Sequence, residues 1–172
     1  MLISLSEIMN ISGSVKHFTV PFEADEVFVG NGTYGIKYKD DVRLDIKNLG
    51  DRKIGIEAQG EFTLSVPCNR CLKEVDVTVP VDLSREVDMR LTSEERSQNL
   101  EDTEYINGYD LDTEKLISEE IMLGFPMKVL CGPECKGICI VCGADLNQGE
   151  CGCDRTVPDP RMAVIRELFN KR

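Results

Sequence analysis

Two long runs of alternating apolar and polar residues dominate the middle of this chain. In the first run, apolar residues or glycine stand at every even position from Ile54 to Val66. In the second, apolar residues stand at every odd position from Val75 to Leu83. A period of two predicts strands with one buried face, and a slip of one residue would turn that face to water. Pro80 lacks a backbone donor, so the second run is predicted at a sheet edge or a bulge.

Shorter segments predict the remaining elements. Val42–Ile46 alternates in the same way, Val15–Phe22 reads as an earlier strand, and the less regular stretch 25–38 contains a GNG turn at 30–32. Helices are expected at Thr113–Leu123, with Asp112 as N-cap, and at Pro160–Asn170, with Asp159 as N-cap and proline in the first helical position. We therefore expect an α+β fold. Its antiparallel sheet either closes on itself like a barrel or packs one face on a helix, and a small Cys-rich, zinc-binding segment follows near the C-terminus.

The chain divides into three regions by composition. Residues 1–90 form the antiparallel sheet region, 91–111 an acidic connector, and 112–172 a region with a helix, a Cys-rich zinc knuckle and a C-terminal helix, expected to make one compact unit with the sheet. Residues 91–120 hold ten acidic and two basic residues, or −8 of the net charge of −11. We interpret the connector as a solvated acidic loop, with a docking surface for a basic partner as the alternative.

Eight cysteines are the chemically distinctive residues. Cys68 and Cys71 form a C-x-x-C loop at the tip of the hairpin that joins the two long runs. The other six fall within 23 residues, with spacings C-x3-C, C-x2-C and C-x-C. A chain without a secretion signal uses such cysteines as metal ligands before disulfides. Glycines such as Gly143 and Gly152 would supply the tight turns that thiolate ligands need.

Sequence order suggests how the cysteines divide. Cys139, Cys142, Cys151 and Cys153 would make one local zinc site, and Cys68 and Cys71 would join Cys131 and Cys135 in a second. Four thiolates leave zinc no open coordination position, so one or two zinc ions would be structural. A single zinc with spare thiols, an iron–sulfur cluster on four of these thiolates, and a redox pair at Cys68 and Cys71 remain alternatives.

The charge balance constrains the partners. With 31 acidic and 20 basic residues, the chain is a poor candidate for binding nucleic acid over its whole surface, because phosphate binding depends on Lys and Arg. A basic partner protein or a local basic patch is the expected contact. The candidate RNA- or protein-contact residues are Arg70, Arg161, Arg166, Lys171 and Arg172. For the last four, a docked terminal helix with cations near its C-terminus is the alternative interpretation.

No catalytic constellation is visible in the sequence. The single histidine, His17, lies in an expected strand, and the chain has neither a GxxxxGK[ST] nor a GxGxxG loop. The longest apolar stretch, 121–127, is too short to span a bilayer, and the N-terminus lacks a basic signal-peptide region. We therefore expect a cytoplasmic protein that is not an enzyme, contacts no membrane and has no small-molecule substrate.

Several segments in a fixed order resemble the YceD-like family of large ribosomal RNA subunit accumulation proteins. These are CNRCL (68–72), DLDTEKLISEEIMLGFPMKVLC (110–131), CKGICIVCGADLN (135–147), CGCD (151–154) and DPRMAVIREL (159–168). The resemblance covers about residues 40–172. The matching positions are Cys68, Arg70, Cys71, Leu72, the six later cysteines and Asp159 to Arg161; Ile140 stands where C-P-x-C is more usual.

The resemblance implies a noncatalytic role in synthesis, processing or stability of 23S rRNA during ribosome biogenesis. Its partner would be the large ribosomal subunit precursor, contacted through rRNA or a basic ribosomal protein. The family varies in how many of the later cysteines it keeps, so a metal would be a stability device of this branch. The alternative hypothesis is a thiol redox or metal-responsive protein-interaction module with no ribosomal role.

Overall fold

The computed structural model describes residues 1–30, 32–91, 95 and 104–154. They divide into two compact units. We call Met1–Val66 with Asp76–Met127 the sheet unit, and Pro67–Val75 with Lys128–Arg172, described to Asp154, the cysteine unit.

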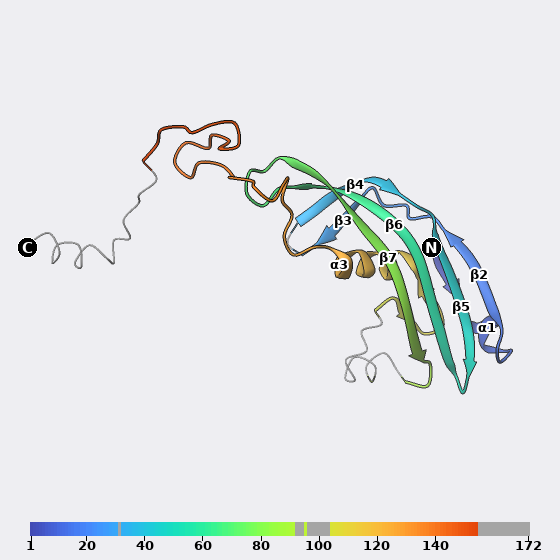
Figure 1. Ribbon diagram of the computed structural model, residues 1–172. Helices are drawn as coiled ribbons and strands as arrows, with labels where there is room; N and C mark the ends of the chain where they lie inside the picture. Colours follow the sequence, from blue (N-terminus) through green and yellow to red (C-terminus); the bar gives the residue numbers. More distant parts are fainter. Residues whose placement is uncertain (31, 92–94, 96–103, 155–172) are drawn as a thin grey trace, which may run out of the picture. The chain divides into compact units, whose positions relative to one another are not determined.

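The main sheet is antiparallel and is built around one long central strand (Figure 1). β4 (Gly32–Lys39) and β5 (Val42–Gly50) follow one another along the same edge of β6 (Lys53–Pro67), with a register shift between Ile36 and Tyr38. β2 (Val15–Val20) pairs with β5, and β3 (Glu26–Val29) pairs with β4. β7 (Glu74–Asp88) pairs with the other edge of β6. Among the described strands it has no further neighbour, so the prediction of an edge strand from Pro80 is confirmed.

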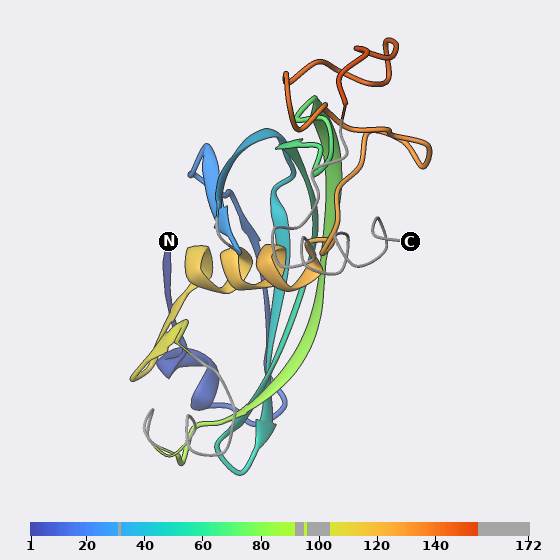
Figure 2. The ribbon, with the colours of Figure 1, turned by 90° about the vertical axis from the view of Figure 1, so that its left-hand side faces the viewer.

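The sheet is open, so the expectation of closure into a barrel is wrong. Its apolar face is instead covered by a helix, α3 (Thr113–Gly124), as Figure 2 shows. Leu116, Ile117 and Ile121 are buried there, and a small void between helix and sheet is lined by Val42 and Leu44 on the sheet side. Because the helix already takes this face out of water, the sheet does not need to close on itself to bury it. The fold expected as α+β is mostly β in the described part of the chain.

A small second sheet completes the sheet unit. β1 (Leu2–Ser4) pairs with β9 (Asp110–Asp112), which pairs with β8 (Ile106–Asn107). A short helix, α1 (Ser6–Met9), follows β1 and buries Ile8. The N-terminus and the end of the expected acidic connector are therefore paired, although neither shows a pattern in the sequence that predicts it.

The helix predicted at Thr113–Leu123 is present, one residue longer, with the predicted cap. The Asp112 side chain accepts hydrogen bonds from the backbone amides of Glu114 and Lys115. The second expected helix, Pro160–Asn170, lies outside the described residues. None of the helices that the structure describes is long and apolar enough to cross a membrane.

Candidate metal centres

The turn between β6 and β7 is a knuckle built around Cys68. Its backbone N–H donates to the Lys73 carbonyl over 2.8 Å, and its carbonyl accepts from Leu72 N over 3.0 Å. The Arg70 backbone N–H points at the Cys68 sulfur, 3.5 Å away. Leu72 holds φ at +63°, in the left-handed region. The turn thus closes on itself and presents Cys68 and Cys71 toward one point.

The same turn occurs a second time in the tail. Cys139 N donates to the Ala144 carbonyl over 2.8 Å, and Gly143 N donates to the Cys139 carbonyl over 2.8 Å. Val141 N lies 3.4 Å from the Cys139 sulfur. Gly143, with φ at +74°, occupies the position that Leu72 has in the first turn. The two C-x-x-C segments are therefore copies of one knuckle, as the pattern of hydrogen bonds shows residue for residue.

The first knuckle meets the Cys131-x3-Cys135 segment within the cysteine unit. The sulfurs of Cys68, Cys71, Cys131 and Cys135 all lie within 4.8 Å of one another. The Cys68–Cys135 sulfur pair is 3.8 Å apart and the Cys71–Cys131 pair 3.5 Å. A disulfide needs about 2.05 Å, whereas four sulfurs at about 2.3 Å from one tetrahedral ion stand about 3.8 Å apart. We call this group the hairpin centre; its spacing fits a bound metal ion and not a disulfide.

The second group is local in sequence. The sulfurs of Cys139, Cys142, Cys151 and Cys153 also lie within 4.8 Å of one another. Gly152, with φ at +69°, turns the backbone between the last two cysteines so that both sulfurs reach the same point. We call this group the tail centre. The structure thus gathers all eight cysteines into two sets of four, each of which could hold a metal ion.

Polar residues around the hairpin centre fix its ligands. The Arg70 guanidinium donates to the Cys135 carbonyl over 2.7 Å. Asn69 exchanges two hydrogen bonds with the backbone of Val129, of 2.8 Å and 2.9 Å, which aligns the segment before Cys131 with the knuckle. Asn147 donates from Nδ2 to the Cys135 sulfur at 3.6 Å. Outer-shell donors of this kind orient metal ligands.

The thiols of the hairpin centre differ in how readily they ionise. Burial by itself would raise the pKa of the Cys68 thiol, but the backbone amides of Cys71, Arg70 and Cys131 outweigh it and lower the pKa to about 6. Hydrogen bonds to the Cys135 and Cys71 sulfurs raise the pKa of Cys131 to about 12. A divalent ion at the centre would supply the positive charge that the remaining thiolates need.

The tail centre has the same arrangement. Backbone amides of Cys142 and Val141 lower the pKa of Cys139 to about 6. Neighbouring sulfurs of Cys142 and Cys151 raise the pKa of Cys153 to about 12. In each centre, backbone amides aimed at the first cysteine of the knuckle lower its thiol pKa, whereas neighbouring sulfurs raise the pKa of Cys131 in the hairpin centre and of Cys153 in the tail centre.

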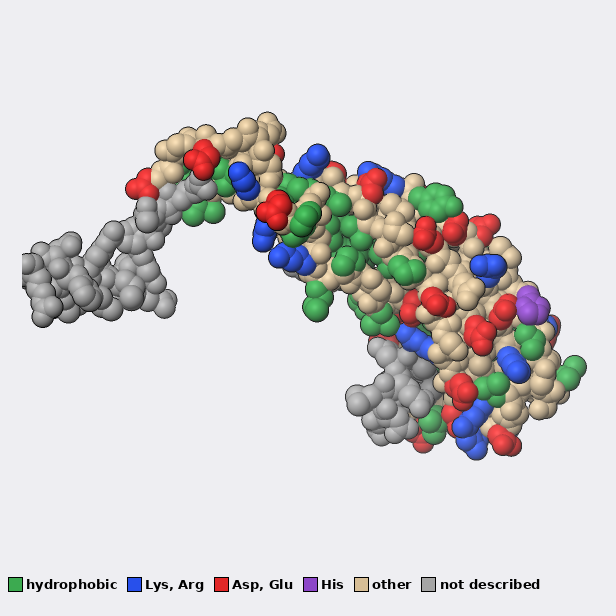
Figure 3. Space-filling view, in the orientation of Figure 1, with side chains coloured by type: hydrophobic (Ala, Val, Ile, Leu, Met, Phe, Trp, Pro, Cys, Tyr) green, Lys and Arg blue, Asp and Glu red, His purple; other side chains and the backbone are tan. Residues whose placement is uncertain are grey.

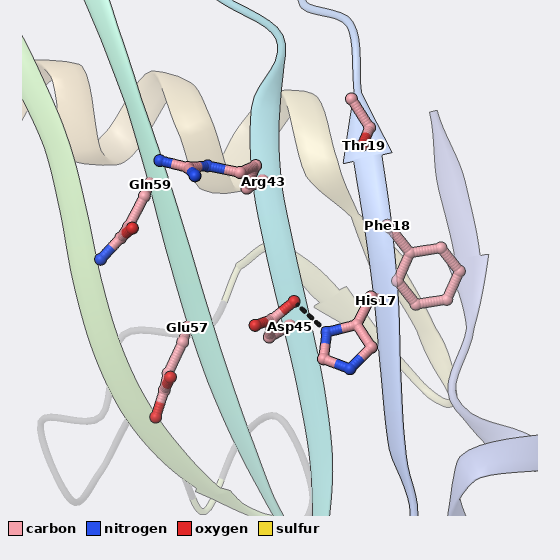
Figure 4. Close-up of a pocket in the computed structure, with 7 residues that line it drawn as sticks. All are labelled: His17, Phe18, Thr19, Arg43, Asp45, Glu57 and Gln59. Atoms are coloured by element: carbon pink, nitrogen blue, oxygen red, sulfur yellow. Dashed lines mark hydrogen bonds and ion pairs between the residues drawn. The ribbon is translucent and has the colours of Figure 1, made fainter.

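Away from these centres, a hollow with a volume of about 380 Å³ lies on the sheet face opposite α3. Figure 4 shows its side chains rising from β2, β5 and β6, with His17 Nδ1 2.7 Å from the Asp45 carboxylate. Glu57 stands opposite Asp45 in the strand register, and Arg43 lies one row along. Both charge signs line the hollow, and they are interspersed over the face seen in Figure 3. The His17 and Asp45 side chains are both exposed to solvent, and no chemistry is assigned to this hollow.

Of the predicted contact residues, only Arg70 is described, and its side chain is engaged in the hairpin centre. Arg161, Arg166, Lys171 and Arg172 lie outside the described residues. Sequence reasoning missed Asn69 and Asn147. The spacing of the cysteines gives no indication of either, although both are polar residues close in sequence to a knuckle or a ligand.

Two comparisons with known proteins give matches. A family model described as "Large ribosomal RNA subunit accumulation protein YceD" matches residues 56–169. A curated protein of Arabidopsis thaliana, "Large ribosomal RNA subunit accumulation protein YCED homolog 1, chloroplastic", is 32% identical over 59 residues, which is 34% of this chain and 18% of that protein. The chain thus spans less than a fifth of the length of that relative. No solved structure matches significantly.

Proposed function

Because this chain belongs to the YceD family of large ribosomal RNA subunit accumulation proteins, we propose that it is a noncatalytic accessory factor in ribosome biogenesis. It acts in the synthesis, processing or stability of the 23S rRNA of the large subunit. One observation carries the proposal: the family match over residues 56–169 contains the β6–β7 hairpin, α3 and all eight cysteines of the two centres. The matched region is thus the part of the chain with the most distinctive chemistry.

Zinc is the metal we propose for both centres. Four thiolates in a tetrahedron are a preferred zinc environment, and in such a site every coordination position is filled by the protein. Backbone amides already point at Cys68 and Cys139, as a thiolate ligand requires. Since no position is left for water or substrate, the zinc ions are structural, which supports a binding role rather than catalysis. A four-thiolate iron–sulfur cluster is the competing occupant.

The partner is the large ribosomal subunit precursor, through rRNA or a basic ribosomal protein. Charge differs sharply between the two units. The sheet unit has 11 basic and 24 acidic residues, a net charge of −13, whereas the cysteine unit has nine basic and seven acidic residues, a net charge of +2. A net charge on a protein surface speeds association with a partner of opposite charge. The sheet unit accordingly suits a basic protein, and any direct RNA contact belongs to the cysteine unit.

Depletion in the source cells tests the function. We expect a selective fall of 23S relative to 16S rRNA and fewer large subunits in the ribosome profile, restored by the wild-type chain. Unchanged rRNA ratios after complete depletion would contradict the proposal. The expected cytoplasmic location is checked by fractionating the same cells, where the protein should co-sediment with large-subunit precursors.

A further inference from the structure

The two metal centres share one short piece of backbone. Cys135, the last ligand of the hairpin centre, and Cys139, the first ligand of the tail centre, are separated by only Lys136, Gly137 and Ile138. Ile138 N donates to the Arg70 carbonyl of the first knuckle over 3.1 Å, and Ile138 also forms a β-bridge with Asp145, just after the second knuckle. One residue is thus held by both knuckles.

Gly137 brings this shared segment close to the first knuckle. Its φ is +80°, and a Cβ there would lie 3.0 Å from the Arg70 carbonyl oxygen. On its other side, the Gly137 carbonyl accepts from Leu146 N over 2.9 Å. The shared segment therefore cannot shift toward one knuckle without losing contacts to the other.

Asn147 connects the centres through its side chain. It lies in the loop between Cys142 and Cys151, which belongs to the tail centre. Its Oδ1 accepts from Lys136 N over 2.8 Å, and its Nδ2 donates to the Cys135 sulfur at 3.6 Å. The residue is itself held by Asp145, whose Oδ1 accepts from the backbone N–H and from Nδ2 of Asn147. A residue of the tail loop therefore orients a ligand of the hairpin centre.

We propose that the two centres bind their metal ions cooperatively, with Asn147 as the positioning residue that couples them. An ion in the tail centre fixes the loop that carries Asn147, and the fixed loop places the Cys135 sulfur for the second ion. Binding of the first ion includes the free-energy cost of ordering residues 136–147. The second ion binds to a segment that is already ordered, so it binds more tightly, which is positive coupling between the sites. By reciprocity, an ion in the hairpin centre strengthens the tail centre by the same factor.

Native mass spectrometry of the full-length chain tests the coupling directly. Metal-free, reduced protein is titrated with Zn²⁺ in the presence of a competing chelator, and the species with zero, one and two ions are counted. Independent sites would leave at least half of the molecules with one ion at half-saturation, whether or not their affinities are equal; we expect the one-ion species to be scarce. A one-ion fraction of about half or more would overturn the inference.

Asn147→Ala keeps all eight thiols and removes the coupling contacts. We expect the one-ion species to accumulate and the apparent affinity for the second ion to fall by about 10-fold or more, the usual effect of losing an outer-shell ligand partner. Gln148→Ala is the matched control, because the Gln148 side chain contacts Asp145 and not a sulfur, and it should load like the wild type. Wild-type loading in Asn147→Ala would overturn the role of Asn147.

This inference rests on the metal binding that we propose above, and the titration separates the two. If the reduced chain takes up no zinc at all, the metal-binding part of the proposed function and the coupling both fail. If it takes up two ions in the proportions of independent sites, only the coupling fails. Neither result bears on the role in 23S rRNA accumulation, which the depletion experiment tests separately.

Discussion

At the scale of single residues, the two knuckles carry different amino acids at the one position that both hold in the left-handed backbone conformation. Gly143 and Leu72 occupy the same left-handed position, yet only glycine adopts this conformation without steric cost. The leucine side chain is 63% exposed, so burial offers little to offset the cost. The first knuckle therefore stores strain that the second avoids, and the surrounding hydrogen bonds hold it in place.

Leu72→Gly should stabilise the metal-loaded protein. Left-handed backbone costs a leucine about 1–2 kcal/mol, and the extra chain entropy of glycine takes back about 0.5–1 kcal/mol. The expected gain is about 0.5–1 kcal/mol, seen as a higher chelator concentration or temperature needed to release zinc from the hairpin centre. Gly143→Ala is the reciprocal variant. Nothing lies within 4 Å of its added Cβ, so a loss there isolates the backbone effect, whereas equal stability of all three proteins would contradict it.

The alternating pattern of the sequence predicted individual core residues well, except where a buried polar side chain occupies a core position. Ile54, Ile56 and Leu64 are buried as their period requires. Asn48 breaks the pattern on β5 yet is only 3% exposed. Its Nδ2 donates to the carbonyls of Ile8 and Ile11, and its Oδ1 accepts from Gly50 N. A buried amide that serves backbone groups 37 to 40 residues away has no periodic signature, so neither α1 nor its attachment could be predicted.

At the scale of elements, sequence predicted the helix and the hairpin because their determinants are local. The Asp112 cap involves only the next three residues of the chain, and the two alternating runs are joined by one short turn. The openness of the sheet is not local. It depends on α3 covering the apolar face, and on β4 and β5 sharing one edge of β6 through the register shift near Tyr38. The division of the cysteines into two sets could be predicted from the sequence, because each knuckle offers two ligands at a fixed spacing. The role of Asn147 could not, because its side chain contacts a ligand of the other centre.

Asp112→Ala should weaken the sheet unit through α3. The substitution leaves the amides of Glu114 and Lys115 without their side-chain acceptor, and lost caps cost about 1 kcal/mol. Denaturant unfolding of the metal-loaded protein measures the loss as a lower midpoint with unchanged slope. Asp112→Ser should recover most of it, and Asp110→Ala, two residues earlier in β9, should have little effect. A midpoint identical to wild type in Asp112→Ala would show that the cap does not matter.

The end of β7 gives the sheet unit an acid-sensitive contact. The Arg90 side chain and backbone N–H donate to the Asp88 carboxylate and hold its pKa well below the usual value. A depressed carboxyl pKa stabilises the fold above the unfolded-state value of about 3.8, and this stabilisation disappears as pH falls through the folded pKa. Asp88→Asn should therefore be less stable than wild type at neutral pH, and the gap should close toward about pH 2.

Unfolding midpoints measured between about pH 7 and pH 2 check this dependence. Glu86→Gln is the matched control, since it neutralises a carboxylate on the same strand that forms no ion pair with any described residue. Its stability difference from wild type should vary less with pH. A gap between Asp88→Asn and wild type that stays constant down to acid pH would contradict the role of the Arg90 contact.

At the scale of the whole molecule, the two units are stabilised by different means. The sheet unit buries a continuous apolar core, with residues such as Phe62 and Leu116 almost fully covered. In the described part of the cysteine unit, the buried side chains are those of three cysteines, Cys68, Cys135 and Cys139, together with Val129 and Leu146. We therefore expect this segment to depend on the proposed metal ligation for its folding. Charge follows the same division, since the acidic residues are concentrated in the sheet unit.

Metal removal should therefore unfold one unit and spare the other. Under a strong chelator and reducing conditions, backbone amides of residues 128–154 should lose hydrogen-exchange protection, while those of β5, β6 and α3 should keep it. Restoring Zn²⁺ should return the protection. Intact protection of the tail after complete removal of metal would show that the cysteine unit folds without it, and collapse of both units together would show that they are not independent.

Because the first knuckle lies at a hairpin tip, its two cysteines are synthesised well before the other two ligands of the hairpin centre. Cys71 precedes its partner Cys131 by 60 residues, and a ribosome adds about 5–20 residues per second, so the first two thiols wait about 3–12 s for the tail to be made. The sheet strands and α3 are translated in that interval. The hairpin centre is nevertheless the first to be completed, because Cys135 emerges before Cys139. The newborn chain thus passes through a stage with a finished sheet sequence and two unligated thiols, the stage at which reducing conditions in the cell matter most to it.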